Sequence, residues 1–366
     1  MYGTEYRIDL KTLSGEKVAE LTGADGLGFL ALAYTKRVNE PGLLSFTLDG
    51  NNPALGLLQR RGQVEVWRRN RRLGIDWYVD FRGLYLGQRH QTQDYSTAQI
   101  TCPGVMTMLG WRHIAYPAGT TDRSAFSNQR AETVMKTLVN RNVGPGATTT
   151  DGRLRNGTIP GITVAPDQGR GNLVTWNCAW DNLLTSLQQL AGIAGGDFDL
   201  TQTDPAEWTF EFYPGQLGTD RSGTLTFSLS FGNMGGPVYT LDYTGAKTVA
   251  IVGGQGREED RELSVVLGDE YATDWDIEVF VNASSAKTAQ GRIDAGLAAL
   301  YERRTKETLS YEVLQTASAA YGRDYFLGDL VRAQYGPMSV TQKVAGVTVE
   351  FDSDGQEQIE VEMETL

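Results

Sequence analysis

The sequence contains few of the residues on which enzymes and disulfide-bonded scaffolds depend. Among its 366 residues there are only two cysteines and two histidines. Cys102 and Cys178 are too far apart in sequence for a CxxC redox or zinc pair, so we expect two free, buried thiols. His90 and His113 each follow an arginine and have no local serine–acid partner, which favours surface or interface positions.

Long apolar runs are also missing. No stretch approaches the roughly 20 apolar residues that a membrane-spanning helix needs. The first residues, MYGTEYRIDL, alternate like a strand and lack the basic and apolar regions of a signal peptide. We therefore expect no membrane span and synthesis and folding in a cytoplasm.

Motifs for catalysis and for metal or nucleotide binding are incomplete. There is no GxSxG elbow. The run Val252–Arg257 follows a predicted strand like a phosphate loop, but it has no Gly-Lys-Ser/Thr ending and leads into charged residues. Asp352–Gly355 begins like a calcium loop, but Met363 stands where a bidentate glutamate is needed. We therefore predict no catalytic residue, no cofactor and no metal.

Three groups of closely spaced carboxylates keep one enzymatic alternative open. They are Asp197 with Asp199, Asp274 with Asp276 and Glu278, and Asp352 with Asp354. Acids that alternate along a strand share one face, so a glycosidase-like pair is geometrically possible. Solvated strand edges and turns produce the same pattern more often. A carbohydrate-active enzyme, a glycan hydrolase using such a pair, is the alternative to a structural role.

The residues that are plentiful indicate a β-rich chain with two differently charged halves. Glycine is frequent, with 43 residues, and strand-forming residues occur throughout, which favours many tight turns. Residues 1–180 carry 21 Lys and Arg against 15 Asp and Glu, whereas residues 181–366 carry 12 against 30. This asymmetry indicates either different partners for the two halves or an acidic surface that keeps the protein soluble.

Hydrophobic periodicity divides the chain into three parts. Residues 1–102 alternate with period two and predict a β-barrel domain, completed by roughly 237–256. Residues 103–236 contain helical patterns at 129–143 and 180–190 and predict an inserted α+β domain. Its Gly144–Gly171 passage has no periodicity and is typical of a contact loop. Residues 257–366 predict a helix at 283–305, with Ile293, Leu297 and Leu300 inward, and a C-terminal β-barrel domain of about four strands.

A motif near the C-terminus brings in a family resemblance. A helix, a strand and then Y-G-x-D-Y-x-L-G-D-x-V at Tyr321–Val331, followed by two more strands, resembles the C-terminal part of the tail-tip or baseplate hub proteins of long-tailed phages. The resemblance extends back through FGNMGGPVYTLDYTGAKTVAIVGGQG to FRGLYLGQRH. It implies a mainly β fold in which two small β-barrel-like domains flank an inserted α+β domain.

The resemblance also implies a function, which is structural and not enzymatic. Hub proteins form a trimeric ring that joins the sixfold tail tube and distal tail ring to a threefold central fibre or spike and gates DNA ejection. The implied partners are two further copies, the distal tail protein, the tail tube, the tape-measure protein, and a tip or fibre receptor-binding protein. DNA would pass through without specific binding. The implied location is the virion tail tip, assembled in the bacterial cytoplasm.

Three narrower expectations follow from this resemblance. Acids in 258–278 and 350–364 would line the channel and repel DNA phosphates. The chain ends where a hub ends, so we expect no C-terminal hydrolase extension. The inserted domain would offer the docking surface for a tip or fibre protein, and deletion of 146–168 would remove that docking but leave a folded trimer.

Overall fold

The chain forms two compact units. A computed structural model describes residues 3–22, 28–92, 96–115, 123–147, 156–271, 275–284, 286 and 288–366. Unit 1 combines Met1–Gly235 with Glu312–Glu364, and unit 2 is Gly236–Tyr311. Both units are built mainly of strands, as the sequence predicted.

The first sheet of unit 1 is antiparallel, with the strand order β2-β1-β5-β6. Its strands are β1 (Thr4–Lys11), β2 (Lys17–Thr22), β5 (Gln63–Asn70) and β6 (Ile75–Leu84). Tyr6, Ile8 and Leu10 of β1 are buried, because side chains two apart on a strand share a face. The hairpin tip between β5 and β6 is basic and forms the short 3₁₀ helix η2 (Arg71–Leu73).

The second sheet of unit 1 has the order β14-β20-β21-β3-β4-β8-β7, with β22 also paired to β21. Its strands from the first hundred residues are β3 (Ala31–Arg37), β4 (Leu43–Asp49), β7 (Gly87–Thr92) and β8 (Ser96–Pro103). Its later strands are β14 (Thr226–Ser228), β20 (Leu330–Tyr335), β21 (Met338–Phe351) and β22 (Glu357–Thr365). Two 3₁₀ helices, η1 (Pro53–Leu57) and η4 (Leu229–Phe231), lie in unit 1 outside the strands.

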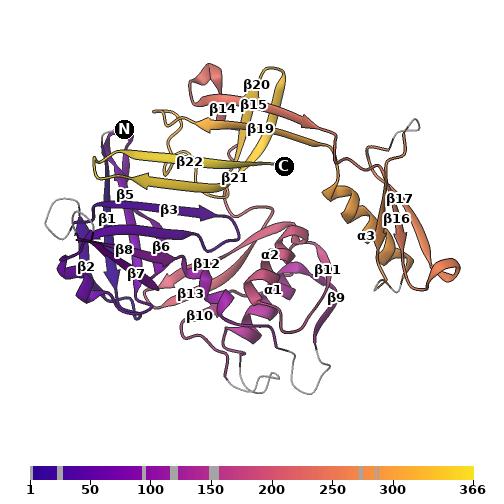
Figure 1. Cartoon of the computed structure of the whole chain (residues 1–366), viewed down its shortest axis with the longest axis horizontal. Coiled ribbons are helices and arrows are strands. Elements are labelled where there is room, and N and C mark those ends of the chain that lie inside the picture. Colours follow the sequence, from indigo (N-terminus) through magenta and orange to yellow (C-terminus); the bar gives the residue numbers. More distant parts are fainter. Residues whose placement is uncertain are drawn as a thin grey trace. The chain divides into compact units, whose positions relative to one another are not determined.

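The C-terminal strands belong to the same sheet as the N-terminal ones. β21 pairs antiparallel with β3 from Gly346 opposite Arg37 to Phe351 opposite Leu32, and the two ribbons lie side by side in Figure 1. The expected completion of the N-terminal domain by 237–256, with a separate second barrel in 257–366, is therefore corrected. Pairing with β3 sets the buried Val349 of β21 beside the buried Tyr34. Across the described residues, the strand pairings form open paths without closing into a ring.

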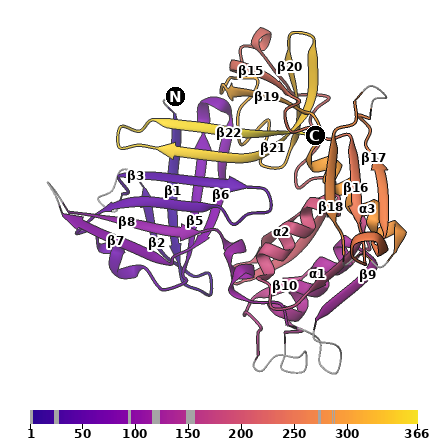
Figure 2. The same cartoon turned by 45° about the vertical axis from the view of Figure 1, so that its right-hand side comes forward.

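The inserted part of unit 1 has two helices packed with two small sheets. The helices, α1 (Ala131–Asn142) and α2 (Leu183–Ala194), lie beside each other in Figures 1 and 2. The sheets pair β10 (Ile162–Val164), β13 (Glu207–Pro214) and β12 (Gly196–Asp204), and separately β11 (Leu173–Cys178) and β9 (Ser124–Arg130). The 3₁₀ helix η3 (Val105–Trp111) follows β8.

Helix boundaries in this part follow the capping residues. The predicted helix at 180–190 is present, but α2 starts at Leu183 because the Asn182 side chain accepts a hydrogen bond from the Thr185 N–H. Gly195 then ends it in the left-handed conformation, at φ 68°. Leu183, Leu187 and Leu190 are buried, as their helical spacing predicted.

Unit 2 contains a three-stranded sheet with a helix on one face. The sheet has the order β17-β16-β18, and a separate two-stranded sheet pairs β15 with β19. The elements are β15 (Met234–Asp242), β16 (Val249–Gly253), η5 (Glu258–Asp260), β17 (Leu263–Leu267), β18 (Glu278–Asn282), α3 (Ala289–Glu302) and β19 (Lys306–Val313). The predicted helix at 283–305 is α3, which begins after the Thr288 cap.

Close packing holds α3 on its sheet. A Cβ on Gly296 would lie 2.6 Å from the Val266 side chain, so only glycine lets helix and strand approach this far. Leu300 is buried and Ile293 packs against the same cluster, as predicted. The predicted inward position of Leu297 is wrong, because about half of its surface is exposed.

Candidate functional site

The hub-like motif at Tyr321–Val331 folds as a tight loop that leads into the first residues of β20. Tyr321 and Tyr325 are fully buried and pair with each other across a single parallel bridge. The Asp329 carboxylate accepts hydrogen bonds from the Thr219 and Phe326 N–H groups at 2.6 and 2.9 Å and from Arg221 at 2.6 Å. The aspartate of the G-D pair therefore fixes this loop to the chain around Thr219.

The two glycines of the motif meet steric requirements. Gly322 and Gly328 have φ of +86° and +85°, a backbone conformation that residues with a side chain rarely adopt. A Cβ on Gly322 would lie 2.3 Å from the Tyr78 hydroxyl oxygen, and one on Gly328 would lie 2.8 Å from the Gly218 nitrogen. The two glycines are therefore needed because the motif packs closely against the segments around Tyr78 and Gly218.

Behind the loop, a buried arginine joins the N-terminal and C-terminal strands. Arg68 on β5 donates from Nε and Nη2 to the two carboxylate oxygens of Glu357 on β22, at 2.7 and 3.1 Å. It also donates to the backbone oxygen of Tyr321 at 3.0 Å. The side chains of Arg68 and Glu357 are only 1% and 4% exposed, and Tyr6 and Thr4 donate further hydrogen bonds to the carboxylate.

A second buried carboxylate, Asp80 on β6, extends this arrangement. It accepts hydrogen bonds from the hydroxyls of Tyr34 and Tyr321 at 2.6 Å each, from Tyr78 at 3.3 Å, and from the Lys36 ammonium. We call the set formed by Tyr34, Lys36, Arg68, Tyr78, Asp80, Tyr321 and Glu357 the Arg68–Asp80 network. It connects β3, β5, β6, β22 and the motif loop.

The charges of this network are fixed by its contacts. Burial alone would raise the pKa of Asp80, but the charges of Lys36 and Arg68 and its hydrogen bonds outweigh burial and lower that pKa. Burial, reinforced by the negative charge of Asp80, raises the pKa of Tyr34 and Tyr321 well above the usual value. Asp80 therefore stays an anion while the tyrosines remain donors.

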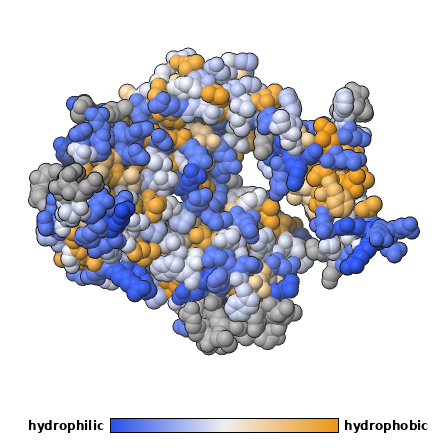
Figure 3. All heavy atoms as spheres, viewed as in Figure 1, coloured by the Kyte–Doolittle hydropathy of each residue, from blue (hydrophilic) through white to orange (hydrophobic). Residues whose placement is uncertain are grey.

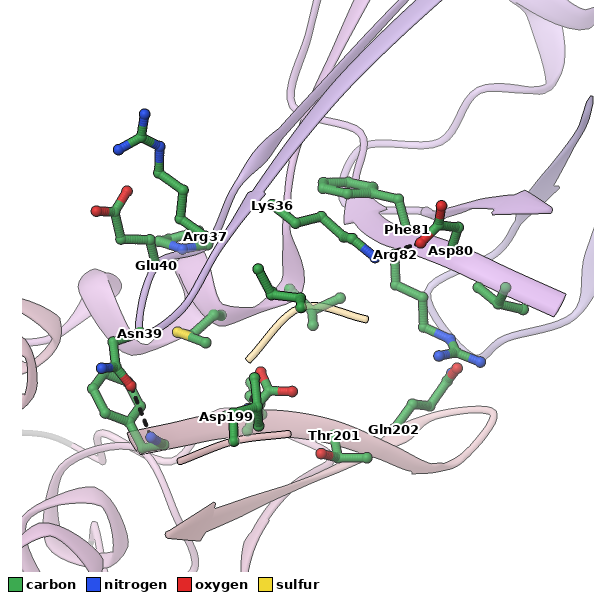
Figure 4. Close-up of a pocket in the computed structure, with 18 residues that line it drawn as sticks. Lys36, Arg37, Asn39, Glu40, Asp80, Phe81, Arg82, Asp199, Thr201 and Gln202 are labelled. Carbon is green, nitrogen blue, oxygen red and sulfur yellow. Dashed lines mark hydrogen bonds and ion pairs between the residues drawn. The ribbon is translucent and has the colours of Figure 1, made fainter. Parts of the chain in front are cut away.

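A cavity of about 180 Å³ lies beside the network (Figure 4). Its walls come from the end of β3, the following turn, β6, η3 and β12. Its polar lining includes Lys36, Glu40, Asp80, Arg82 and Asp199. For Asp197 and Asp199 to act on a sugar as predicted, both carboxylates would have to face this cavity.

Asp197 does not line the cavity and has a structural role. Its carboxylate accepts hydrogen bonds from the Asn39 amide at 3.0 Å and the Leu217 N–H at 2.9 Å. Lys343 of β21 lies 3.3 Å from the same carboxylate. Asn39, held in the left-handed region at φ 62°, also accepts a hydrogen bond from the Phe198 N–H. Asp197 thus fastens the turn after β3 and β21 to β12.

Asp199, unlike Asp197, lines the cavity. Burial raises its pKa, and the Leu200 N–H and the charges of Lys36 and Arg82 only partly oppose that effect. A retaining or inverting glycosidase needs a second carboxylate facing the same sugar. Two further carboxylates line the cavity: Asp80, which four donors occupy, and Glu40 on the turn after β3. Figure 4 shows Glu40 beside Arg37, with its carboxylate turned away from Asp199. Neither one therefore forms a free pair with Asp199 across the cavity.

The remaining predicted carboxylates lie on exposed segments. Asp352 accepts hydrogen bonds from the Asp354 and Gln356 N–H groups and so closes the β21–β22 turn. Asp276 and Glu278 are exposed in unit 2, and Asp274 lies outside the described residues. Within the described part of the chain, no three His, Cys, Asp or Glu residues are grouped to hold a metal ion.

The other candidate residues occupy unreactive positions. Cys102 and Cys178 are free and buried, and burial raises the pKa of Cys178 to about 11. His90 is exposed on β7, and the ring of the exposed His113 lies 2.9 Å from the Trp180 carbonyl. The 252–257 loop leads from β16 through η5 to β17, as its lack of a phosphate-loop ending indicated.

The Gly144–Gly171 passage is only partly described, since 148–155 lies outside the described residues. Its later portion contains β10, paired parallel to β13. Arg170 donates to Glu132 and Glu211, and Lys136 bridges the same two acids. The end of this passage is therefore anchored to α1 and β13.

Comparison with known families assigns the chain. Residues 22–363 match the model of the Siphovirus ReqiPepy6 Gp37-like protein family. The chain belongs to this family. No curated protein matches the sequence. Among the described residues, no helix of this Gp37-like protein is long and apolar enough to cross a membrane.

Solved structures show which fold the Gp37-like chain has. It is similar to the 43 kDa tail protein of prophage MuSo2 from Shewanella oneidensis, with a TM-score of 0.59, 13% identity, and 99% of this chain and 98% of that chain covered. A tail protein from Neisseria meningitidis MC58 gives 0.58 and 12%, with 100% and 97% covered. Prophage tail protein gp18 from Listeria monocytogenes EGD-e gives 0.52 and 13%, with 99% and 94% covered. The predicted resemblance to phage tail proteins is thus confirmed for family and fold.

Sequence reasoning missed the Arg68–Asp80 network. Arg68 is one of several arginines around the basic hairpin tip, and Glu357 alternates with other acids on β22. Nothing local marks either as buried. The one available signal was the motif itself, since its glycines and paired tyrosines indicated close packing against a partner segment.

Proposed function

We propose that this protein is a structural hub of a siphophage tail tip or baseplate. Three copies form a ring that joins the sixfold tail tube and distal tail ring to a threefold central fibre or spike and gates DNA ejection. The observation that carries the proposal is that the family match and the tail-protein fold both extend over nearly the whole chain.

The construction of unit 1 supports a mechanical role. Segments more than 280 residues apart are joined by the β21–β3 pairing and by the buried Arg68–Glu357 pair. Buried polar networks with every partner present rigidify a fold. A hub under load from the tail tube needs such rigidity. The glycan hydrolase alternative needs two free carboxylates that face one sugar, whereas Asp197 and Asp80 are both held by hydrogen-bond donors.

The partners follow from the hub role. They are two further copies of the chain, the distal tail protein, the tail tube, the tape-measure protein, and a tip or fibre receptor-binding protein docked on the inserted domain. The location is the virion tail tip, after assembly in the host cytoplasm. The strongly acidic second half supports a channel wall that repels DNA phosphates. No specific DNA binding is proposed.

The decisive experiment is imaging of the tail tip together with the mass of the purified chain in solution. A threefold ring of this chain between the tube and the fibre, and a trimer by light scattering at micromolar concentration, are the expected results. A virion whose tip lacks the chain would refute the proposal. Cleavage of peptidoglycan by purified trimer, lost in Asp199→Asn, would instead favour the hydrolase.

A further inference from the structure

The three-stranded sheet of unit 2 has an apolar face that α3 does not cover. The strand register places Val265, Ile251 and Phe280 in one row across β17, β16 and β18. Leu263 and Leu267 continue the same face along β17, two residues to either side of Val265. We call these five residues the open sheet face. Four of them, all except Ile251, are between 52% and 65% exposed.

Such a sheet is apolar on both sides. The opposite side, with Val252 and Val266, packs against α3. Sheets with apolar residues on both faces are normally covered on both, and contiguous exposed apolar patches mark interaction sites. Figure 3 shows a cluster of hydrophobic residues on the visible side of unit 2. The open sheet face therefore fits a protein partner.

Charges around the face define the chemistry of that partner. Glu278 lies on the same side of the sheet, in the row of Leu267 and Val249. The acidic turn Glu258–Asp260 precedes one end of β17, and Asp269 and Glu270 follow the other end. Arg261 lies over the Phe280 ring at 5.1 Å and adds a single positive charge. A matching partner is apolar in its centre and basic at its margin.

Unit 1 contains a surface with that composition. A groove of about 510 Å³ is lined by Arg60, Arg61, Leu86, Trp111, Arg112, Ile159 and Pro160. Arg60 and Arg61 are exposed, and the Arg61 guanidinium lies 5.8 Å from the centre of the Trp111 ring. The groove belongs to the half of the chain in which Lys and Arg outnumber Asp and Glu.

We propose that the open sheet face of unit 2 binds this basic groove on a second copy of the chain. The inference rests on the proposed ring. In a ring of identical subunits, each contact joins one surface of a subunit to a different surface of the next copy. Opposite charge on the two surfaces favours this head-to-tail contact and disfavours face-to-face pairing of two acidic units.

A matched pair of substitutions tests the face. Leu267→Asp places a charge on it, whereas Leu173→Asp makes the same change at an equally exposed strand leucine of β11 in unit 1. We expect Leu267→Asp to raise the concentration for half-trimerisation at least about tenfold, because binding would bury the new carboxylate against apolar side chains. Leu173→Asp leaves it unchanged. Both variants are expected to keep the wild-type melting transition in thermal unfolding. Light scattering over a concentration series measures trimerisation.

Photo-crosslinking identifies the acceptor. A benzophenone amino acid is placed at position 265 in one isotopically labelled copy and mixed with unlabelled chain before assembly. Crosslinks from labelled to unlabelled peptides around Arg60, Leu86 or Trp111 support the contact. Crosslinks confined to the probe's own copy, or to other peptides of its neighbour, overturn it.

The two proposals fail differently. If wild type forms a trimer and Leu267→Asp forms it equally well, the docking face is wrong and the hub function stands. If wild type stays monomeric at all concentrations and no ring of it is found in the virion, the hub function fails, and the inference falls with it.

Discussion

Arg68 and Glu357 form a two-point ion pair although 289 residues separate them in the chain. The pair is almost completely buried, and Tyr321 adds a backbone acceptor to the arginine. Taking two charges out of water is costly, so such a pair is tolerated only when each remaining donor and acceptor finds a partner. Here the partners come from β1, β5, β22 and the motif loop, which makes the pair a joint between chain ends.

Arg68→Met is expected to lower the free energy of unfolding by about 3–5 kcal/mol, because it leaves the Glu357 carboxylate buried and unpaired. The matched control is Arg37→Met. Arg37 pairs at 2.9 Å with Glu362, which lies on β22 like Glu357, but both of these side chains are about half exposed. That change is expected to cost about 1 kcal/mol or less. Urea unfolding of both variants measures the difference, and equal losses would contradict a buried joint.

Gly322→Ala is expected to destabilise the protein by more than about 2 kcal/mol, because backbone strain and a steric clash act together. The new Cβ would meet the Tyr78 hydroxyl oxygen at 2.3 Å and push on the Arg68–Asp80 network. Gly336→Ala is the control: its φ is also positive, at +58°, but nothing lies within 4 Å. It should cost about 1 kcal/mol. Thermal unfolding that ranks the two equally would show that the close contact is unimportant.

Acid should weaken the inserted part of unit 1 through Glu132. Burial alone would raise the pKa of this fully buried acid, but hydrogen bonds from Arg170 and Lys136 outweigh burial and lower the pKa to about 2. A lowered folded-state pKa gives stability that is complete above the unfolded value near 4.3 and is lost as pH falls toward 2. The shift corresponds to about 3 kcal/mol.

Glu132→Gln tests this directly. The variant should be less stable than wild type at pH 7, and the gap should close between about pH 5 and pH 2. Urea unfolding at a series of pH values supplies the measurement. A gap that is independent of pH would mean that the ionised carboxylate contributes nothing.

Local patterns predicted the elements of this fold better than their partners. The helices at α1 and α2 and the β3–β4 hairpin follow from periodicity, caps and turn residues. The pairing of β21 with β3 could not be predicted in this way, because the alternation of Val347, Val349 and Phe351 fits any apolar sheet edge. Residues 237–256 carry equally good strand patterns but pair within unit 2. Long-range partner choice depends on packing that a single sequence does not display.

The same limit applies to the sites. The acids Asp197 and Asp199 look equivalent in sequence, two apart on one strand. Only the fold reveals that Asn39, Leu217 and Lys343 surround the first, while the second faces a cavity. Family resemblance gave the hub assignment without locating any contact, because its motif residues serve packing within one chain.

Asp199→Asn and Asp197→Asn are therefore expected to change stability in opposite directions. Burial raises the pKa of Asp199, so its folded form favours the proton, and stability is lost as pH rises from the unfolded pKa through the raised one. Asparagine removes that loss and should stabilise the protein at pH 7, an advantage that disappears as pH falls below the unfolded pKa of about 3.9.

Asp197→Asn removes the ionic partner of Lys343 and weakens the hydrogen bonds from Asn39 and Leu217. It should destabilise the protein by about 2 kcal/mol at pH 7. Urea unfolding of both variants at pH 7 and pH 3.5 measures the two signs, and light scattering should find wild-type trimers in Asp199→Asn. Destabilisation by both changes would mean that Asp199 is held by contacts like those of Asp197. In that case the two substitutions would not distinguish Asp197, a structural carboxylate, from Asp199, a cavity carboxylate whose burial opposes its charge.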